Sequence, residues 1–343
     1  MPTRYAVSLK IDASRYEILD QRALPSAEHW RDVRSVAAML DAIRTLTVRG
    51  APLLGVSASL CLAYRAQAGD TPAQLREAAG VLRAARPTAV NLHAALDAMV
   101  GALDAQGPEG LIDAAFRWFD DDVAMSEALA EHGAALLDDG DGVITHCNTG
   151  ALATVGVGTA LGVIARAHAQ GKRLHVWVDE TRPLLQGARL TTWELRRLGI
   201  PHTLITDSMA ALVLREGLAA KAMVGADRVS RNGDAANKVG TYGLAVQCHF
   251  HGARFYVVAP STTYDGRCAS GRDIEIEARD PDEVRGFVSP STALRWAPAE
   301  VAVMNPAFDV TPARLIDALV FEQGVFAPGA VAAGLGGVLP PAR

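Results

Sequence analysis

A cysteine and an aspartate lie where an α/β enzyme would hold its reactive side chains. Cys147 comes directly after a short apolar run, 143–146, that predicts a strand, and a helical stretch follows it. The N-terminus of a helix lowers the pKa of a nearby thiol, so Cys147 is a candidate reactive group, although a buried cysteine that ends a strand would show the same pattern. Asp227 follows a second expected strand, 222–224, and is a candidate general acid or base.

Several polar neighbours of these residues have roles that the pattern leaves open. His146 should point to the opposite face of its strand from Cys147, so we interpret it as a structural group and not as the base for the thiol. Arg182 and Arg189 follow the acidic residues 179–180. The two arginines are either partners of an anionic ligand or structural partners of these acidic residues.

Three polar residues beyond the expected strands are candidate ligand contacts. Gln186 precedes Gly187, and the missing side chain of a glycine lets a ligand approach closely. Asn237 and Lys238 precede the helical stretch 240–250, whose first backbone amides could hold a phosphate or sugar hydroxyls. Because the chain has 29 arginines and only four lysines, Lys238 is not easily explained as ordinary surface polarity.

The N-terminal third offers two more candidate anion sites. Arg49, Gly50 and Ala51 open one expected helix, and Arg86 precedes Pro87 at the start of another. An arginine beside the unpaired amides of a helix start is suited to binding an anion. Arginine with a proline close behind it is also common at ordinary helix starts, so each pattern alone is compatible with a structural role.

The motifs of metal, serine and P-loop chemistry are absent from the sequence. It contains no H-E-x-x-H, no Cys/His cluster at zinc spacing, no G-x-S-x-G and no G-x-x-x-x-G-K-[ST]. The glycines at 156, 158 and 162 resemble a dinucleotide fingerprint, but they lie too far beyond the strand, and packing of a helix on a sheet explains them better. The remaining prediction is a site without metal or cofactor for a small phosphorylated and hydroxylated molecule.

The first part of the chain predicts a β-hairpin followed by helices. Alternating apolar residues over about 5–11 and 16–19 flank a polar turn. The polar run 138–142 ends the helical pattern and is the predicted boundary between domains 1–138 and 139–343. The helical segments between the hairpin and this boundary are 30–46, 51–65, 72–85, 89–103 and 109–137.

The second domain is expected to be an α/β fold with a parallel sheet. Strands that alternate with helices indicate βαβ units, and the carboxyl ends of such strands carry ligand sites. The Gly/Ala/Pro-rich tail after about residue 329 is expected to be partly disordered. The expected strands are 143–146, 174–178, 202–205, 222–224 and 254–258.

Composition excludes several classes of protein. Half of the residues are hydrophobic and 21% are charged, as in an ordinary globular chain, and 33 Lys+Arg against 38 Asp+Glu give a net charge of −5. No basic run offers a surface for nucleic acid or an anionic membrane. With neither a long apolar stretch nor a signal peptide, the protein is expected to be cytoplasmic. The four scattered cysteines predict reduced thiols, of which Cys61, Cys248 and Cys268 are packing residues.

Six motifs follow one another between about Leu19 and about Gly329. They are TVRGAP (47–52), RPTAVNL (86–92), THCNTGALAT (145–154), DETRPLLQGARLT (179–191), GADRVSRNGDAANKVGTYGLAV (225–246) and NPAFDVTP (305–312). Together they resemble the methylthioribose-1-phosphate isomerases of methionine salvage. The departures from that family, at residues 53–54, at Trp177 and in the segment 261–265, remove none of the candidate site residues.

The resemblance implies a fold, a reaction and a set of site residues. It implies a hairpin and helical N-terminal domain with a Rossmann-like catalytic domain, a homodimer, and no metal or redox cofactor. The implied reaction converts the aldose 5-methylthioribose 1-phosphate into the ketose 5-methylthioribulose 1-phosphate. Cys147 and Asp227 fall on the family's catalytic pair, with Asp227 as the acid for the ring oxygen. The implied phosphate and sugar contacts are Arg49, Gly50, Ala51, Arg86, Gln186, Asn237 and Lys238.

Three related roles remain open. A 5-deoxyribose-1-phosphate isomerase would differ from the main interpretation only in the 5-substituent of its substrate. A ribose-1,5-bisphosphate isomerase should need a further cation near the 5-position, and none is evident in the sequence. A regulatory subunit of the translation initiation exchange factor would not need Cys147 and Asp227 within intact motifs.

Overall fold

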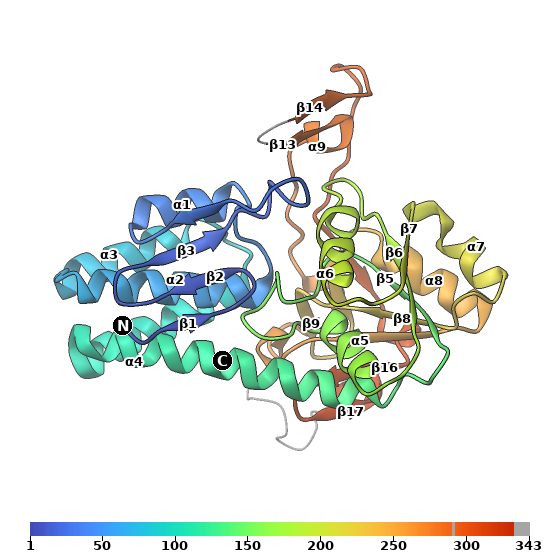
Figure 1. Ribbon diagram of the computed structural model, residues 1–343, viewed down its shortest axis with the longest axis horizontal. Coiled ribbons are helices and arrows are strands. Elements are labelled where there is room, and N and C mark those ends of the chain that lie inside the picture. Colours follow the sequence, from blue (N-terminus) through green and yellow to red (C-terminus); the bar gives the residue numbers. More distant parts are fainter. Residues whose placement is uncertain (290–291, 333–343) are drawn as a thin grey trace. The chain divides into compact units, whose positions relative to one another are not determined.

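The computed structural model describes residues 1–289 and 292–332, which Figure 1 shows as a ribbon. The tail that was expected to be partly disordered lies outside the described residues from 333 onwards, and its first part forms the short helix α10 (Pro328–Ala332). Within the described part of the chain, no helix combines the length and the hydropathy that crossing a membrane requires.

The described chain packs as two compact units. The first comprises Met1–Met125 and Ala151–Gly156. The second comprises Ser126–Gly150 and the chain from Val157 onwards. The predicted domains 1–138 and 139–343 are a different division of the chain, and their assignment stays a prediction.

The first unit contains a small antiparallel sheet in which consecutive strands are neighbours. Its strands are β1 (Arg4–Tyr5), β2 (Leu9–Ile11), β3 (Tyr16–Leu19) and β4 (Trp30–Asp32). The predicted hairpin is confirmed by the pairing of β2 with β3. The segment that was expected to be helical from residue 30 instead begins with β4, because its residues pair with β3, and the helix starts only after Ser35, whose side chain accepts a hydrogen bond from the N–H of Ala38.

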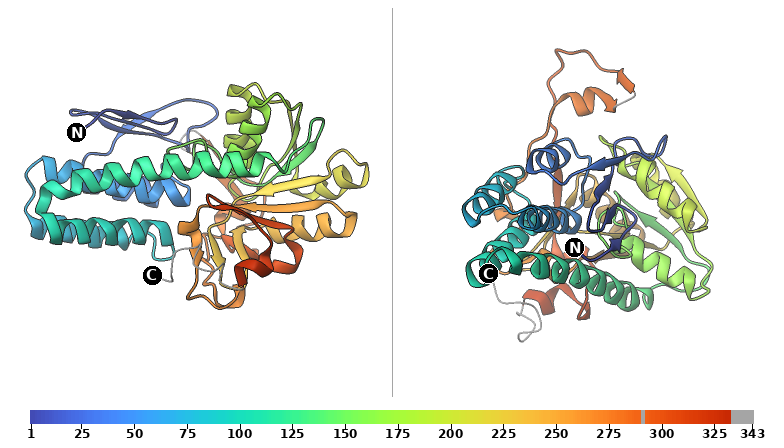
Figure 2. Two further views of the ribbon diagram at one scale, coloured as in Figure 1. Left: turned by 90° about the horizontal axis from the view of Figure 1, so that it is seen from below. Right: turned by 60° about the vertical axis from the view of Figure 1, so that its left-hand side comes forward.

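Helices form the rest of the first unit, and Figure 2 shows the small sheet lying over them. Gly107 (φ 73°) and Pro108 divide α4 into two helical segments, as the two patterns on either side of this point predicted. The middle helix α2 is buried over most of its length and carries the core of the unit, where the Tyr16 hydroxyl donates a hydrogen bond to the Ser57 carbonyl (2.8 Å). The helices are α1 (Val36–Arg44), α2 (Ala51–Gln67), α3 (Pro72–Arg83) and α4 (Val90–Ala134), of which the last part, from Ser126, belongs to the second unit.

The second unit is built on a seven-stranded sheet in the order β17-β16-β11-β8-β5-β6-β7. Neighbouring strands are parallel except at the β17 edge, so this part of the chain is an α/β fold with a parallel sheet, as predicted. The sequence pattern predicted the first five of these strands but neither of the last two. The strands are β5 (Gly142–Thr145), β6 (His175–Asp179), β7 (His202–Ile205), β8 (Lys221–Val224), β11 (Arg254–Val258), β16 (Ala318–Phe321) and β17 (Gly324–Phe326).

Helices and short turns connect these strands. The chain runs from β5 to β6 and β7 on one side of the sheet and then returns to β8 on the other side of β5. The strand order therefore reverses between β5 and β8, and in open α/β sheets ligands bind in the crevice outside such a point. The connecting helices are α5 (Ala160–Ala169), η1 (Gly187–Thr191), α6 (Thr192–Arg197), η2 (Asp207–Met209), α7 (Ala210–Arg215), α8 (Thr241–His251) and η3 (Ser261–Thr263).

Two smaller β-structures complete the second unit. One is a four-stranded sheet in the order β12-β9-β10-β15, and the other is the hairpin β13–β14 with the short helix α9, which Figure 1 shows standing out from the rest of the unit. Their elements are β9 (Arg228–Ser230), β10 (Ala235–Lys238), β12 (Tyr264–Asp265), η4 (Gly271–Asp273), α9 (Asp282–Arg285), β13 (Gly286–Ser289), β14 (Thr292–Arg295), β15 (Phe308–Thr311) and η5 (Ala313–Leu315).

Candidate active site

The candidate site of the second unit lies at the carboxyl ends of β5 and β8, where the strand order reverses. These strands are hydrogen-bonded neighbours, and the Thr145 hydroxyl donates to the Met223 carbonyl (2.9 Å). Just beyond them, a Cβ on Gly225 would lie only 2.7 Å from the Thr149 side chain, so the segments that follow the two strands are in contact. Cys147 and Asp227 belong to these two segments, and the structure therefore brings them to one edge of the sheet.

Hydrogen bonds on both sides fix the backbone of Cys147. The Cys147 N–H donates to the hydroxyl of Thr181 (2.8 Å), and its carbonyl accepts from the hydroxyl of Thr191 (2.6 Å). Cys147 has a φ of 66°, a left-handed conformation that residues with a side chain rarely adopt. Only 7% of the residue is exposed. A buried thiol on a strained turn at the end of a central strand is typical of a functional position.

Asp227 lies at the base of the β9–β10 hairpin. Its N–H donates to the carbonyl of Ala236 (2.8 Å), which places it across the hairpin from Asn237. The residue is half-buried. The hairpin thus joins the candidate acid and two candidate ligand contacts, Asn237 and Lys238, in one rigid element.

Asn237 and Lys238 have defined partners within the second unit. Asn237 is buried, and its amide donates to the hydroxyl of Thr241 (3.0 Å), which in turn donates to the Lys238 carbonyl (2.7 Å). The Lys238 ammonium donates to the Ala307 carbonyl (2.7 Å) and lies 4.6 Å from the centre of the Phe308 ring. These contacts hold both side chains at the junction of β10 and α8.

The first amides of α8 are not available to an anion in the way the sequence suggested. The N–H groups of Gly240 and Tyr242 donate to the two carboxylate oxygens of Asp309 (2.7 and 3.0 Å). Burial raises the pKa of Asp309, although these two hydrogen bonds oppose the shift. The expectation that amides near Gly240 hold a phosphate is therefore wrong for these two groups, because a side chain from β15 already caps the helix.

Gln186 lies at the start of η1 and is 5% exposed. Its Oε1 has no hydrogen-bond partner among the residues that the structure describes. A buried polar atom that lacks a partner is costly, and a hydroxyl of a bound ligand would satisfy it. Gly187 has a different role from the expected one: a Cβ there would lie 1.8 Å from the Asp179 carbonyl, so the glycine makes room for the backbone and not for a ligand.

The remaining candidate contacts belong to the first unit. Gly50 caps α2 with a φ of 102°, and a Cβ there would lie 2.5 Å from the Cα of Ala153. A Cβ on Gly55 would lie 2.9 Å from the Asn91 carbonyl, so the second turn of α2 lies against the first turn of α4. The two expected anion sites, at Arg49–Ala51 and at Arg86, therefore flank neighbouring helix starts. These four residues belong to the first unit, and the other five candidates belong to the second.

The buried His146 and Asp179 and the half-buried Asp207 form a cluster with the spacing of metal ligands. The imidazole Nδ1 lies 3.0 Å from Asp179 Oδ2, and Nε2 lies 2.9 Å from the Val239 carbonyl. Asp207 accepts from the N–H groups of Thr181 and Arg182 (both 2.7 Å). Because protein atoms are within hydrogen-bond distance of both ring nitrogens, we interpret the cluster as a hydrogen-bonded network.

The two arginines of the segment 179–191 have structural partners. Arg182 donates to the Val284 carbonyl (3.0 Å), and its guanidinium lies 4.7 Å from the centre of the Trp296 ring. Arg189 donates to the Leu184 carbonyl (3.0 Å) and lies 5.7 Å from the Phe287 ring centre. They fasten this segment to α9 and the β13–β14 hairpin, a role that neither of the two expected interpretations included.

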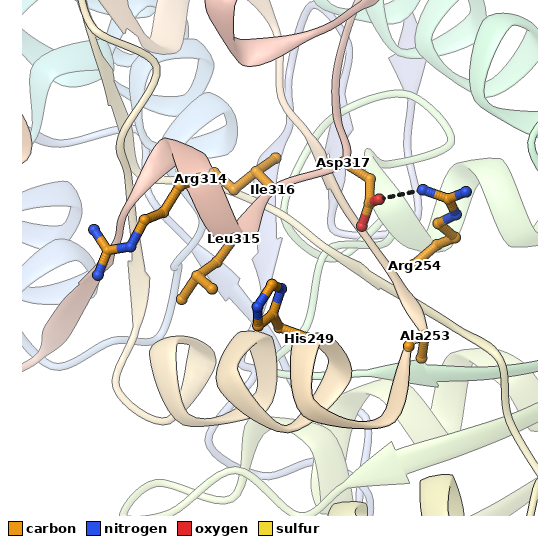
Figure 3. A pocket seen from close by; sticks show the side chains of 8 residues that line it. His249, Ala253, Arg254, Arg314, Leu315, Ile316 and Asp317 are labelled. Carbon is orange, nitrogen blue, oxygen red and sulfur yellow. Dashed lines mark hydrogen bonds and ion pairs between the residues drawn. The ribbon is translucent and has the colours of Figure 1, made fainter.

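A cavity of about 300 Å³ elsewhere in the second unit is not part of this site. Figure 3 shows its lining, in which Arg254 and Asp317 form an ion pair (2.7 Å) beside His249. Arg254 begins β11, and Asp317 directly precedes β16. The cavity therefore lies at the amino ends of the parallel strands, whereas Cys147 and Asp227 follow the carboxyl ends.

Sequence reasoning missed the residues that hold the reactive side chains. Thr181 and Thr191 fix Cys147, and Asp309 caps α8, but none of them was singled out. The two threonines lie inside the motif 179–191, which is the only signal in the sequence that could have pointed to them. Their partners are distant along the chain, so no local pattern contains the pairing.

Comparisons with known proteins agree with this architecture. The model of the initiation factor 2 subunit family matches residues 47–328. The chain is 52% identical to a methylthioribose-1-phosphate isomerase of Klebsiella pneumoniae (strain 342) over 335 residues, 97% of this chain and 98% of that one. It is 51% identical to the protein of that name from Serratia proteamaculans (strain 568), over 96% of each chain.

Two solved structures are also similar. The 5-methylthioribose 1-phosphate isomerase from Pyrococcus horikoshii OT3 superposes with a TM-score of 0.89 at 36% identity, over 98% of this chain and 96% of that one. The translation initiation factor eIF-2B subunit delta from A. fulgidus gives a TM-score of 0.84 at 39% identity, over 98% and 99%. This chain belongs to the initiation factor 2 subunit family and, within it, to the methylthioribose-1-phosphate isomerases.

Proposed function

We propose that this protein converts 5-methylthioribose 1-phosphate into 5-methylthioribulose 1-phosphate in methionine salvage, without a metal or redox cofactor. The observation that carries the proposal is the position of Cys147 and Asp227 on adjoining segments beyond β5 and β8, where the strand order reverses. The high identity to isomerases of that name over nearly the whole chain supports the same substrate.

Asp227 is the proposed acid. The anomeric carbon of the substrate carries the phosphate, so the ring cannot open to a free aldehyde. A proton must reach the ring oxygen while its bond to C1 breaks, and the resulting positive charge is shared between C1 and its remaining oxygen. The half-buried carboxyl of Asp227 supplies this proton.

Cys147 is the proposed partner in moving hydrogen from C2 to C1. In one route the Cys147 sulfur takes the proton from C2 to leave an enol, and it returns the proton to C1 while the 2-hydroxyl loses its own proton and the ketone forms. In the other route a hydride moves directly from C2 to C1, the 2-hydroxyl loses its proton as the ketone forms, and the buried turn around Cys147 shields the cation from water. Both routes leave a ketone at C2 and the phosphate on C1.

The proposed substrate contacts form one group in each unit. Arg49, Gly50, Ala51 and Arg86 suit a phosphate because they lie at the neighbouring starts of α2 and α4. Gln186 suits a sugar hydroxyl through its buried Oε1, and the β10–α8 junction contributes Asn237 and Lys238.

We further propose a cytoplasmic homodimer, a domain arrangement in which residues 1–138 accompany a Rossmann-like catalytic domain 139–343, and no nucleic acid or membrane as a partner. The net charge of −5 and the absence of a helix that could cross a membrane among the described residues support the last point. The exposed apolar side chains of Tyr242, Val246 and Phe250, which lie at intervals of four residues on α8, support self-association.

The decisive experiment compares three substrates and two variants. The purified protein is assayed with 5-methylthioribose 1-phosphate, 5-deoxyribose 1-phosphate and ribose 1,5-bisphosphate, and the highest kcat/KM is expected for the first. Asp227→Asn and Cys147→Ser should each lower kcat by at least about 100-fold with the fold intact. A protein inactive on all three sugars that copurifies with an initiation factor would instead support the regulatory-subunit role.

Deuterium at C2 of the substrate separates the two routes of hydrogen transfer. Loss of the label to solvent indicates a proton relay through Cys147. Full retention at C1 favours the hydride shift.

A further inference from the structure

The buried pair formed by His146 and Asp179 has no part in the chemistry proposed above. The two side chains are only 1% and 3% exposed, and 3.0 Å separates Nδ1 of His146 from Oδ2 of Asp179. The other carboxylate oxygen, Oδ1, is buried and lacks a hydrogen-bond partner within the described chain. Burying two ionisable groups in this way is costly, which calls for a reason to keep them.

The hydrogen bonds fix the number of protons on the pair. The Val239 carbonyl can only accept, so Nε2 of His146 carries a proton and donates it (2.9 Å). One further proton must lie between Nδ1 and Oδ2, either on the imidazole or on the carboxyl, because otherwise a lone pair would face a carboxylate. In both cases the pair is neutral overall, and the ring is held at both nitrogens.

This ring joins the segments that carry the proposed catalytic and binding residues. His146 directly precedes Cys147, and Val239 directly follows Lys238. Gly240 packs on the ring so closely that a Cβ there would lie 2.8 Å from Cε1. The carbonyl of Asp179 accepts from the Thr181 hydroxyl (3.0 Å), the same hydroxyl that accepts from the Cys147 N–H.

We propose that His146 is a positioning residue: held by Asp179, its imidazole ties the strained turn at Cys147 to the β10–α8 junction that presents Asn237 and Lys238. The expected effect of His146 on kcat rests on the function proposed above. The expected effect on the reactivity of the Cys147 thiol rests on the geometry alone. It extends the structural role that the sequence suggested for His146 to a specific task in the site.

The directions of the pKa shifts of His146 and Asp179 agree with a proton held between the two side chains. Burial lowers the pKa of His146, but its hydrogen bond to Asp179 and the charges of Asp179 and Asp207 outweigh burial, so the net shift is upward. Burial raises the pKa of Asp179 more strongly than His146 lowers it. Both shifts favour keeping the proton between the two side chains.

The first test replaces His146 by phenylalanine, which fills the space without hydrogen bonds. His175→Phe is the matched control, because His175 also joins two elements of the same unit, through Thr203 on β7 (2.9 Å), but at the start of β6. His146→Phe should lower kcat about 100-fold with a smaller change in KM, since Arg49 and Arg86 are untouched. His175→Phe should keep the kcat of the original protein.

The second measurement does not depend on isomerase activity. The rate of alkylation by iodoacetamide is followed at each cysteine by peptide mapping. In His146→Phe the rate should rise severalfold at Cys147 alone, while the three other cysteines, all buried, stay slow. A protein that shows this selective change but isomerises none of the sugars would support the positioning role and refute the proposed function.

Two variants of Asp179 test the same proposal if His146→Phe does not fold. In Asp179→Asn the amide N–H can donate to a neutral imidazole while Nε2 keeps its bond to Val239, so kcat and the alkylation rate should stay near their original values. Asp179→Ala removes the support and should behave like His146→Phe. Equal behaviour of the two Asp179 variants would overturn the proposal, as would a folded His146→Phe protein with unchanged kcat and unchanged reactivity at Cys147.

Discussion

Three residues in the segments that follow β5 and β6 have a left-handed backbone conformation. Cys147, Thr181 and Leu185 have φ values of 66°, 65° and 58°, and each costs about 1–2 kcal/mol relative to an ordinary conformation. The hydrogen bond from the Cys147 N–H to Thr181 joins two of these strained positions. Strain of this kind persists only where the surrounding structure fixes it.

A buried carboxyl in the first unit should make stability depend on pH. Asp122 accepts a hydrogen bond from the Val155 N–H (2.8 Å), and burial raises its pKa to about 6. In the unfolded chain this carboxyl ionises near its ordinary pKa of about 4. The folded protein therefore loses stability as the pH rises from about 4 to about 6, and the group destabilises it fully above that range. Asp122→Asn keeps the acceptor and should raise the free energy of unfolding at pH 7.5 by up to about 3 kcal/mol, with little change at pH 4.

Urea denaturation at the two pH values measures this effect. The neighbouring Asp121→Asn is the control, since Asp121 is exposed and should change stability little at either pH. An Asp122→Asn protein that gains no stability at pH 7.5 would contradict the prediction.

Two features favour glycine at position 50: a left-handed backbone conformation and the close approach of Ala153. A pair of glycine-to-alanine variants distinguishes their effects on stability. Gly50→Ala meets both an unfavourable φ of 102° and the backbone of Ala153, whereas Gly69→Ala meets only an unfavourable φ of 94°, because no atom lies within 4 Å. We expect a loss of about 1–2 kcal/mol for Gly69→Ala and about 3 kcal/mol for Gly50→Ala. Equal losses in thermal or urea denaturation would mean that Ala153 can move away at no cost.

At the scale of elements, the parallel sheet and its connections decide where the chemistry lies. β5 and β8 deliver Cys147 and Asp227 to one edge, and η1 supports the first of them through Thr191. The β9–β10 hairpin then places Asn237 across from Asp227. Each of these elements is short, so single hydrogen bonds between them are important for fixing the positions of the site residues.

Two threonine variants test the support that η1 provides. Thr191→Val leaves the buried Cys147 carbonyl without its 2.6 Å hydrogen bond and should cost about 1–3 kcal/mol of stability and lower kcat. Thr311→Val is the matched control in the same unit, because the Thr311 hydroxyl is buried and has no partner in the described part of the chain. It should leave stability unchanged or raise it. If urea denaturation shows that Thr311→Val loses more stability than Thr191→Val, the hydrogen bond from Thr191 does not support the turn at Cys147.

At the scale of the whole molecule, the apolar surface of the second unit suggests how two copies could meet. Tyr242, Val246 and Phe250 follow one another at intervals of four residues on α8, so they lie on one face of the helix. They are 42%, 41% and 82% exposed. Contiguous exposed apolar side chains mark interaction surfaces more often than ordinary surface.

Phe250→Asp should therefore convert the proposed dimer into a monomer. Light scattering after size exclusion should give the mass of two chains for the original protein and of one chain for the variant. Met304→Asp is the control, because Met304 is also highly exposed (88%) but lies outside α8. An original protein with the mass of one chain would contradict the dimer, and a dimeric Phe250→Asp protein would move the interface to another surface.

The sequence was sufficient for the α/β class and for five strands of the main sheet, and it placed Cys147 and Asp227 directly after two of these strands. Apolar periodicity reports which face of an element is buried, and strand ends in parallel sheets are where sites form, so these features are local. The strand at residues 30–32 escaped prediction, as did β16 and β17, because their pairing partners and not their own patterns make them strands.

Only the tertiary structure decided which groups are hydrogen-bonded to or packed against each other. His146 binds the carbonyl of Val239, 93 positions along the chain, and Asp309 takes the amides of α8 that the sequence had left open for an anion. The Asp179 carbonyl occupies the space that a Cβ on Gly187 would need, and Arg182 donates to the Val284 carbonyl in α9. The sequence by itself determined which residues are chemically able to act, since that follows from residue type and local pattern. Hydrogen bonds and close packing between distant segments are set by the folded chain, so only the structure could assign the partners that fix those residues in place.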